Sequence, residues 1–388
     1  MTIQEVASKY EAYQIEMRRY FHMYPEESGK EYNTSKKVKE ELDKIGVSWR
    51  DCGMETGVLA TIEGAKPGKT ILLRADMDAL SVPEETGVEY ASKNEGIMHA
   101  CGHDCHTSML LTAAHILNDM RDELCGTVKF AFQPAEEIGK GAASMIEQGA
   151  MDGVDGAFGI HIWSDVESGK VACSAGPRMG AANMFTVDIQ GRGGHGSAPH
   201  QCVDAAVVTT AIVTNLQSVV SRNVAPMDAA VLTVGVIESG ARWNVIADKG
   251  HLEGTTRCFS TEVNDNLPIW MDRVIQQTAA AYGATAVLNY TKLLPPTVNH
   301  ESMVELVKAS SRKAIGEDAP YELVPTLGSE DFSYYTQKAP GAIAFLGCAN
   351  EACDSCWPQH HPKYNVDESV LIKGAMLYAQ VAMDHNAL

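Results

Sequence analysis

The chain has 388 residues, of which 45% are hydrophobic and 21% are charged, and this composition is typical of a folded globular protein rather than a disordered or fibrous one. Its 50 acidic residues outnumber its 31 basic residues, and the formal net charge of −19 disfavours binding to nucleic acid or to anionic membranes. Because single domains usually hold about 100–200 residues, a chain of this length predicts two domains.

The N-terminal segment from Met1 to Val6 is polar and lacks a basic region followed by an apolar one, so it does not have the pattern of a secretory signal. No apolar run approaches the roughly 18–20 residues that a membrane span needs. We therefore expect a cytoplasmic protein that binds neither nucleic acid nor membranes, with its ten cysteines present as reduced thiols rather than as a disulfide framework.

The first half of the chain alternates helical and extended patterns. Residues 4–45 have a helical pattern with a break near Tyr24-Pro25 and a stop at Gly46. Four short apolar runs follow, each typical of a strand: Gly57–Ile62, Thr70–Arg74, Thr127–Gln133 and Val154–Ile162. The helical patterns among them cover Thr107–Asp119 and Ala142–Gly149. This alternation predicts an α/β domain with a mainly parallel sheet.

The pattern changes after Gly180. Strand and helix patterns follow each other in the order β-α-β-β-α-β, which is typical of a small α+β sandwich. They cover Met184–Ile189, Val203–Val220, Ala230–Ile237, Gly250–Phe259, Asn264–Ala281 and Ala284–Tyr290. The segment Leu293–Pro296 has the character of a boundary, and helix–strand alternation then resumes. We predict one α/β domain of residues 1–182 and 295–388, interrupted by an inserted α+β domain of residues 183–294.

Five short segments concentrate His, Cys, Asp and Glu, and most of them follow an apolar run. In an open α/β sheet, the loops at strand ends form the ligand-binding cleft. The segments are Arg74–Leu80, His99–Thr107, Gln133–Glu137, Gly159–Trp163 and Gln359–Pro362. Taken singly, each has an ordinary interpretation, such as a solvated Glu-Glu pair at a helix start or a hydrogen-bonded histidine in the core. Taken together, thiolate, imidazole and carboxylate groups predict a site for a transition-metal ion.

These motifs resemble those of the M20 metallopeptidase and amidohydrolase family, in the branch with hippurate hydrolases, auxin-conjugate hydrolases and N-acetyl-diaminopimelate deacetylases. They occur in the family's order over nearly the whole chain. The matching segments are Arg74–Leu80 (RADMDAL), His99–Thr107 (HACGHDCHT), Phe132–Glu137 (FQPAEE), Gly191–His200 (GRGGHGSAPH), Asn244–Arg257 and Gly328–Phe332 (GSEDF). The resemblance implies a metallohydrolase domain of mainly parallel sheet, with an inserted α+β domain that serves as a lid and in dimerisation.

The resemblance also implies two divalent metal ions. Cys101 would bridge the two ions, His103 and His161 would complete the ligands of one ion, and Glu137 and His360 those of the other. The histidine at position 360 is preferred to its neighbour because it lies two residues before the proline, as in the family. The metal is left open among zinc, manganese, nickel and cobalt, since thiolate and imidazole suit zinc while relatives also work with the other three.

The remaining roles follow from the same resemblance. Glu136 would be the general base, and Asp78 would hydrogen-bond to a metal-binding histidine such as His103 and so orient it. His195, in the inserted domain, would reach the active site of a neighbouring subunit and donate to the substrate's carbonyl oxygen, which implies a homodimer. Asn244 and Arg257 would hold the substrate's carboxylate. The implied reaction is hydrolysis of the amide bond of an N-acyl amino acid or a dipeptide-like substrate, whose acyl group and side chain the sequence leaves open.

Two other functions are weighed against this one. The first is a metal-dependent binding protein that keeps the fold without catalysis, and the presence of Glu136 argues against it because a binding protein needs ligands but no base. The second is a two-metal phosphoesterase, which is disfavoured because the inserted domain offers single His and Arg residues rather than a glycine-rich anion site.

The sequence departs from the family's pattern at several positions. Cys105 stands where relatives usually have glycine, and it could perturb the metal site or make it sensitive to oxidation. Ser81 and Ala247 both replace prolines, and the second change weakens the assignment of Asn244. A group of cysteines, Cys348, Cys353 and Cys356, precedes His360 and predicts a loop at the substrate rim more readily than a separate metal site. The segment Gly328–Phe332 is expected to begin a helix, with Ser329 as N-cap, or to contact substrate.

Overall fold

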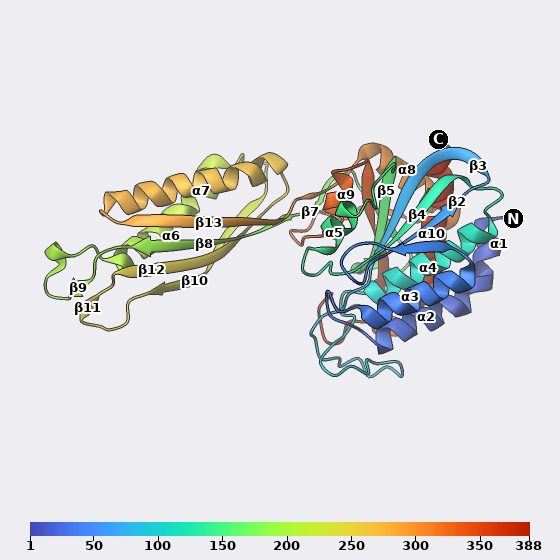
Figure 1. Ribbon diagram of the computed structural model, residues 1–388, viewed down its shortest axis with the longest axis horizontal. Coiled ribbons are helices and arrows are strands. Elements are labelled where there is room, and N and C mark those ends of the chain that lie inside the picture. Colours follow the sequence, from blue (N-terminus) through green and yellow to red (C-terminus); the bar gives the residue numbers. More distant parts are fainter. The chain divides into compact units, whose positions relative to one another are not determined.

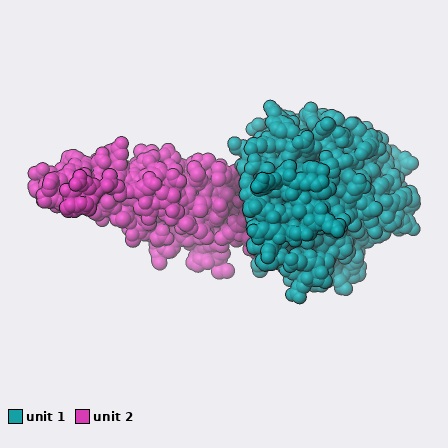
Figure 2. Space-filling view, turned by 90° about the horizontal axis from the view of Figure 1, so that it is seen from below, with its two compact units in different colours: residues 1–176, 298–324, 331–388 teal, residues 177–297, 325–330 magenta.

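A computed structural model describes residues 1–388 and divides into two compact units (Figures 1 and 2). Unit 1 comprises Met1–Gly176, Val298–Val324 and Asp331–Leu388, and unit 2 comprises Pro177–Thr297 and Pro325–Glu330. The short segment Pro325–Glu330 therefore groups with unit 2, although the sequence-based boundaries place it in the stretch 295–388. Neither unit contains a helix with the length and apolar character required to traverse a bilayer.

Unit 1 is built on an eight-stranded sheet in the order β1-β2-β4-β3-β5-β16-β6-β15. Its strands are β1 (Ser48–Asp51), β2 (Val58–Glu63), β3 (Lys66–Asp76), β4 (Cys125–Gln133), β5 (Gly156–Glu167), β6 (Val171–Ala172), β15 (Pro320–Tyr321) and β16 (Gly341–Ala349). The four central strands β4, β3, β5 and β16 run parallel, while β1, β2 and β6 introduce antiparallel pairs. The predicted α/β class with a mainly parallel sheet is thus confirmed.

Helices cover both faces of this sheet. They are α1 (Ile3–Ala7), α2 (Glu11–Met23), α3 (Tyr32–Ile45), α4 (His103–Asp119), α5 (Gly141–Glu147), α8 (Glu301–Ala314), α9 (Ser333–Thr336) and α10 (Leu371–Asn386). Successive residues of β3 point to opposite faces, so Ile71 and Leu73 join the large core beneath α4 and α10, while Leu72 joins a smaller core with residues of α5 and α9. Burial on both faces explains why the central strands are continuous apolar runs.

Helix α3 illustrates how local chemistry sets an element's end. Val38, Leu42 and Ile45 form its buried stripe, and Gly46 follows in the left-handed region with φ of 79°. The backbone N–H of Gly46 donates to the carbonyls of Leu42 and Asp43, which satisfies carbonyl groups that the helix end leaves free. The predicted stop at Gly46 is confirmed.

Unit 2 contains a four-stranded antiparallel sheet in the order β10-β12-β8-β13. Its elements are β8 (Ala181–Gln190), β9 (Gly194–His195), α6 (Ala205–Asn223), β10 (Ala230–Ser239), β11 (Val245–Ile246), β12 (Lys249–Cys258), α7 (Thr261–Ala281) and β13 (Thr285–Leu294). Helices α6 and α7 lie against one face and share a core with the sheet (Figure 1). The chain passes between the units at β7 (Gly176–Met179) and β14 (Thr297–Asn299), which pair with each other. The predicted α+β insert is confirmed, and its main sheet is antiparallel.

Candidate metal centre

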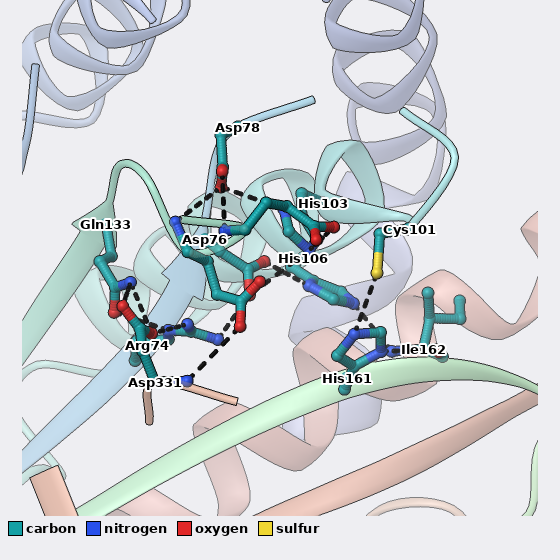
Figure 3. Close-up of polar contacts among 12 residues, drawn as sticks. Arg74, Asp76, Asp78, Cys101, His103, His106, Gln133, His161, Ile162 and Asp331 are labelled. Atoms are coloured by element: carbon teal, nitrogen blue, oxygen red, sulfur yellow. Dashed lines mark hydrogen bonds and ion pairs between the residues drawn. The ribbon is translucent and has the colours of Figure 1, made fainter. Parts of the chain in front are cut away.

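The candidate metal centre lies in unit 1, where β3 and β4 end in polar side chains and β5 carries His161 just beyond its ladder with β3 (Figure 3). Neighbouring parallel strands bring their carboxyl ends to one edge of the sheet, so segments far apart in sequence meet there. Helix α4 begins at the same place, with His103 as its first residue. These elements and the segments next to them supply Asp76, Asp78, Cys101, His103, Glu136, Glu137 and His161.

Gly102 forms the turn between Cys101 and His103. Its φ of 88° lies in the left-handed region, and a Cβ at this position would lie 2.4 Å from Cγ2 of Ile162 and 2.8 Å from the hydroxyl oxygen of Tyr364. Only glycine meets both the conformational and the spatial demand. The Cys-Gly-His sequence thereby brings a thiol and an imidazole into one buried site.

His161 presents one nitrogen to the thiol. The Cys101 Sγ atom lies 3.5 Å from His161 Nε2, while His161 Nδ1 donates to the carbonyl oxygen of Ile162 at 2.7 Å. The proton is therefore assigned to Nδ1, and Nε2 carries the lone pair. Burial lowers the pKa of His161 well below its usual range, so the ring is neutral, which is the form that binds metal ions.

His103 is held by a carboxylate on one side and lacks a partner on the other. Its Nδ1 lies 3.3 Å from Asp78 Oδ1, whereas the buried Nε2 has no hydrogen-bond partner. That Nε2 lies 3.9 Å from Glu137 Oε1, a second buried atom with no hydrogen-bond partner. Burial by itself would lower the pKa of His103, but Asp76 and Asp78 outweigh it and raise this pKa to about 10. The position therefore favours positive charge.

His360 approaches the same carboxylate from the C-terminal part of unit 1. Its Nε2 lies 3.4 Å from Glu137 Oε1. The residue adopts a φ of 66°, and its backbone N–H donates to the carbonyl oxygen of Ala100 at 2.8 Å, directly before Cys101. A left-handed conformation is uncommon for a non-glycine residue, and here it accompanies a contact that ties this loop to the thiol segment.

The donor atoms form two groups that share one sulfur. Those of Cys101, His103 and His161 lie within 4.8 Å of one another, and so do those of Cys101, Glu137 and His360. Burial, together with the carboxylates of Glu137 and its neighbour, raises the pKa of the Cys101 thiol well above its usual range, so the thiolate requires a nearby cation. One thiolate, three imidazoles and one carboxylate, with orphaned buried atoms among them, fit divalent ions of the zinc type.

Asp78 contacts both the backbone of the Glu136–Glu137 turn and the ring of His103. The backbone N–H groups of Glu136 and Glu137 donate to its two carboxylate oxygens at 3.1 and 3.0 Å, and Ser28 donates to it at 2.6 Å. The same carboxylate holds the Nδ1 side of His103. One buried side chain thus fixes His103, a candidate metal ligand, and the turn that carries both glutamates.

The three residues predicted to bind substrate lie in unit 2, outside this cluster. His195 Nδ1 accepts the backbone N–H of Ser197 at 3.1 Å, which assigns the ring proton to Nε2 and leaves an N–H free to donate. Asn244 directly precedes β11, which pairs with β9, and its carbonyl oxygen accepts the N–H of Gly196 at 3.0 Å. Arg257 lies on β12 with its side chain half-buried.

The structure bears on two further expectations from the sequence. Cys105 is fully buried, and burial followed by the charge of Asp104 raises the pKa of its thiol, which disfavours the reactive thiolate. The expected helix start with Ser329 as N-cap is wrong, because α9 begins only at Ser333. The nearby Asp331 turns inward, where Arg74 donates to its carboxylate at 2.8 Å.

Residues that contact the site but were given no role from the sequence include the buried His106 and Glu31 and the partly buried Ser28. His106 follows His103 by three positions on α4, a spacing that places two side chains on one helix face and could have revealed it. Glu31 accepts the backbone N–H of Ala135, which has a φ of 55°, at 2.9 Å, and so supports the turn before the glutamates. Neither Ser28 nor Glu31 lies in a motif, and their contacts depend on the tertiary fold.

The fold and the donor cluster together indicate a metal-dependent hydrolase. The chain matches the model of peptidase family M20/M25/M40 over residues 72–384 and belongs to this family. Thermostable carboxypeptidase 1 of Saccharolobus solfataricus is 42% identical over 374 residues, which is 95% of this chain and 94% of that protein. N-acetyl-L-cysteine deacetylase of Bacillus subtilis is 41% identical over 361 residues, covering 93% and 85%.

A solved structure is similar throughout. The crystal structure of a dinuclear metal binding peptidase of the M20 family from Bacillus subtilis superposes with a TM-score of 0.86 at 33% identity, covering 97% of this chain and 98% of that one. The family resemblance stated from the motifs is confirmed, and the chain is a hydrolase of this family.

Proposed function

We propose that this protein hydrolyses the amide bond of an N-acyl amino acid or a dipeptide-like substrate, using two divalent metal ions. The observation that carries the proposal is the pair of donor groups, Cys101 with His103 and His161, and Cys101 with Glu137 and His360, which share a single sulfur. When bound, ions in such a site polarise a carbonyl group and make a coordinated water acidic near neutral pH. Zinc suits the donor set, and manganese, nickel and cobalt are to be tested beside it.

Glu136 is the general base in this proposal. Its side chain is 8% exposed, and its Oε1 accepts the backbone N–H of Asp331 at 3.4 Å, which holds the carboxylate beside the donor atoms. It would take the proton of the attacking water and pass it to the departing amine. Asp78 keeps the turn of Glu136 and the ring of His103 in fixed positions. Neither proton step requires a side chain from outside unit 1.

The polar residues of unit 2 would recognise the substrate. The Nε2–H of His195 is free to donate to a carbonyl oxygen as negative charge develops on it. Arg257 and Asn244 would bind the free carboxylate of the substrate, for which a guanidinium group offers two parallel hydrogen bonds. The two relatives named above are a carboxypeptidase and a deacetylase, and both of those names describe cleavage of an amide bond beside an amino acid.

The general base is tested with Glu136→Gln, and with Glu147→Gln, at an exposed position of α5, as the control. Metal content is measured by mass spectrometry, and free amino acid released from N-acetyl, N-benzoyl and dipeptide substrates is quantified. We expect about two ions per chain in all three proteins and a kcat lowered about 10²–10⁴-fold only in the first variant. A wild-type protein that holds both ions and cleaves nothing in the panel would favour a binding protein instead.

Substrate recognition is tested with Arg257→Met. We expect a raised KM for N-acetyl amino acids and no change for the corresponding amino acid amides, because the amides lack the carboxylate. An equal effect on both substrate series would contradict the assigned contact.

The homodimer is tested by light scattering and by subunit exchange. If His195 acts in a neighbouring subunit, mixing inactive Glu136→Gln and His195→Ala proteins should restore activity, because one mixed site keeps both residues. A fully active monomer, or mixed subunits that stay inactive, would refute this arrangement.

A further inference from the structure

A row of buried, hydrogen-bonded polar side chains lies beside the candidate metal centre (Figure 3). Arg74 donates to Asp331 at 2.8 Å on one side and to Asp76 on the other, and His106 Nδ1 lies in hydrogen-bond contact with Asp76. All four side chains are at most 1% exposed. None of them belongs to the two donor groups that share the thiol, so the mechanism proposed above gives His106 no task.

At one end of this row, His106 contacts β5, the strand that carries His161. The backbone N–H of Ile162 donates to His106 Nε2 at 2.8 Å. Because that nitrogen accepts, the ring proton is assigned to Nδ1, where it is donated to Asp76. The His106 ring also lies edge-on to the ring of His161, with centroids 4.6 Å apart and planes at 69°.

Sheet topology explains why a side chain takes this position. The ladder between β3 and β5 ends at the pair of Arg74 and Gly159, so the following residues of β5 have no strand partner on that side. A buried backbone N–H without a partner is costly, and His106 supplies the acceptor that β3 no longer offers to Ile162. Ile162 directly follows His161 on β5, so this hydrogen bond fixes the backbone next to His161.

We propose that His106 is a positioning residue for His161: it holds the backbone of β5 through Ile162 and the imidazole ring through their edge contact, while Asp76 fixes its tautomer. This inference rests on the proposed function in that His161 is taken as a metal ligand. It assigns to the third histidine of the HACGHDCHT segment a task that binds no metal. We therefore expect that loss of His106 weakens the binding of only one of the two ions, because His161 belongs to only one of the two donor groups.

The test measures the affinity of each ion, not only activity. His106→Leu, His106→Gln and the control His115→Leu are titrated with Co²⁺ against a chelator, and the cobalt absorption spectrum and the melting temperature of the metal-free proteins are recorded. His115 lies on the same helix but stacks on Tyr10, at 4.6 Å between centroids. Loss of a group that orients a ligand typically weakens metal binding about 10–100-fold.

We expect His106→Leu to weaken one ion about 10–100-fold and leave the other unchanged, with an altered cobalt spectrum. His106→Gln should recover part of the loss, since an amide oxygen can accept the N–H of Ile162. His115→Leu should change neither affinity. Unaltered binding of both ions in His106→Leu would overturn the inference. It would also be overturned if His106→Leu and His115→Leu weakened both ions to the same extent. A wild-type protein that fails to bind two ions would refute the proposed function itself, and that result is seen before any variant is compared.

Discussion

Replacing Gly102 by alanine probes the turn that brings Cys101 and His103 together. A non-glycine residue in the left-handed region costs about 1–2 kcal/mol. The added Cβ would also lie 2.4 Å from Ile162, and overpacking of this kind costs about 1–3 kcal/mol. We therefore expect Gly102→Ala to lower the free energy of unfolding by about 2–5 kcal/mol, measured for the metal-free protein from the urea transition that unfolds unit 1.

Gly96→Ala is a matched control for this prediction. Gly96 has a φ of 77°, and a Cβ there would meet nothing within 4 Å, so only the backbone cost of about 1–2 kcal/mol applies. The control should also retain metal, whereas Gly102→Ala should lose affinity because the displaced turn carries two donors. Equal destabilisation by the two substitutions, with equal metal content, would refute the argument that close approach of Ile162 fixes this turn.

Three other predictions concern thiols, acid stability and metal affinity. Iodoacetamide should alkylate the exposed Cys353 and Cys356 in the folded protein but not Cys348, whose pKa is raised to about 12 by burial. Peptide mass spectrometry would measure this, and an early adduct on Cys348 would contradict the prediction. Burial would raise the pKa of Asp367, but hydrogen bonds from neighbouring side chains outweigh it and hold this pKa at about 2 instead of 3.8. The stability that ionised Asp367 contributes is therefore complete above about pH 3.8 and is lost as the pH falls through about 2. Asp367→Asn should accordingly lower the free energy of unfolding near neutral pH and have a smaller effect near pH 2, and denaturation curves at several pH values that show a constant difference would disprove it. Asp78→Asn should weaken metal binding about 10–100-fold, because an amide offers one acceptor instead of two, and chelator competition with an unchanged affinity would count against the role of Asp78.

The secondary structure was accessible from the sequence where the hydrophobic pattern is strong. The stripe of α3 and its glycine stop, and the buried runs of β3, β4 and β5, are local signals and occur where predicted. The order of the strands has no such signal, and the antiparallel placement of β2 beside β4 depends on contacts across the whole sheet. The grouping of Pro325–Glu330 with unit 2 likewise depends on tertiary packing.

The candidate donor residues were accessible from motifs, whereas their orientation was not. A sequence gives no indication of which nitrogen of His103 or His161 is free, because that is decided by Asp78 and by the carbonyl oxygen of Ile162. The failed prediction at Ser329 has a related cause. An N-cap contributes about 1 kcal/mol, while breaking the buried ion pair between Arg74 and Asp331 would cost several, so the chain turns Asp331 inward instead.

The pair Glu136-Glu137 shows why the ordinary interpretation of this motif fails. A solvated pair at a helix start would be stabilised by the helix dipole, but α5 begins only at Gly141 and the glutamates lie in a turn before it. Asp76 and Asp78 are buried beside them, and Arg74, the guanidinium in this cluster, is shared with a further carboxylate. One guanidinium shared by two carboxylates balances only part of this acidic cluster, and an unbalanced buried carboxylate costs several kcal/mol, so the cluster favours further positive charge. Divalent ions would supply that charge, and for this reason the carboxylates support a metal centre rather than a fold held together by ion pairs alone.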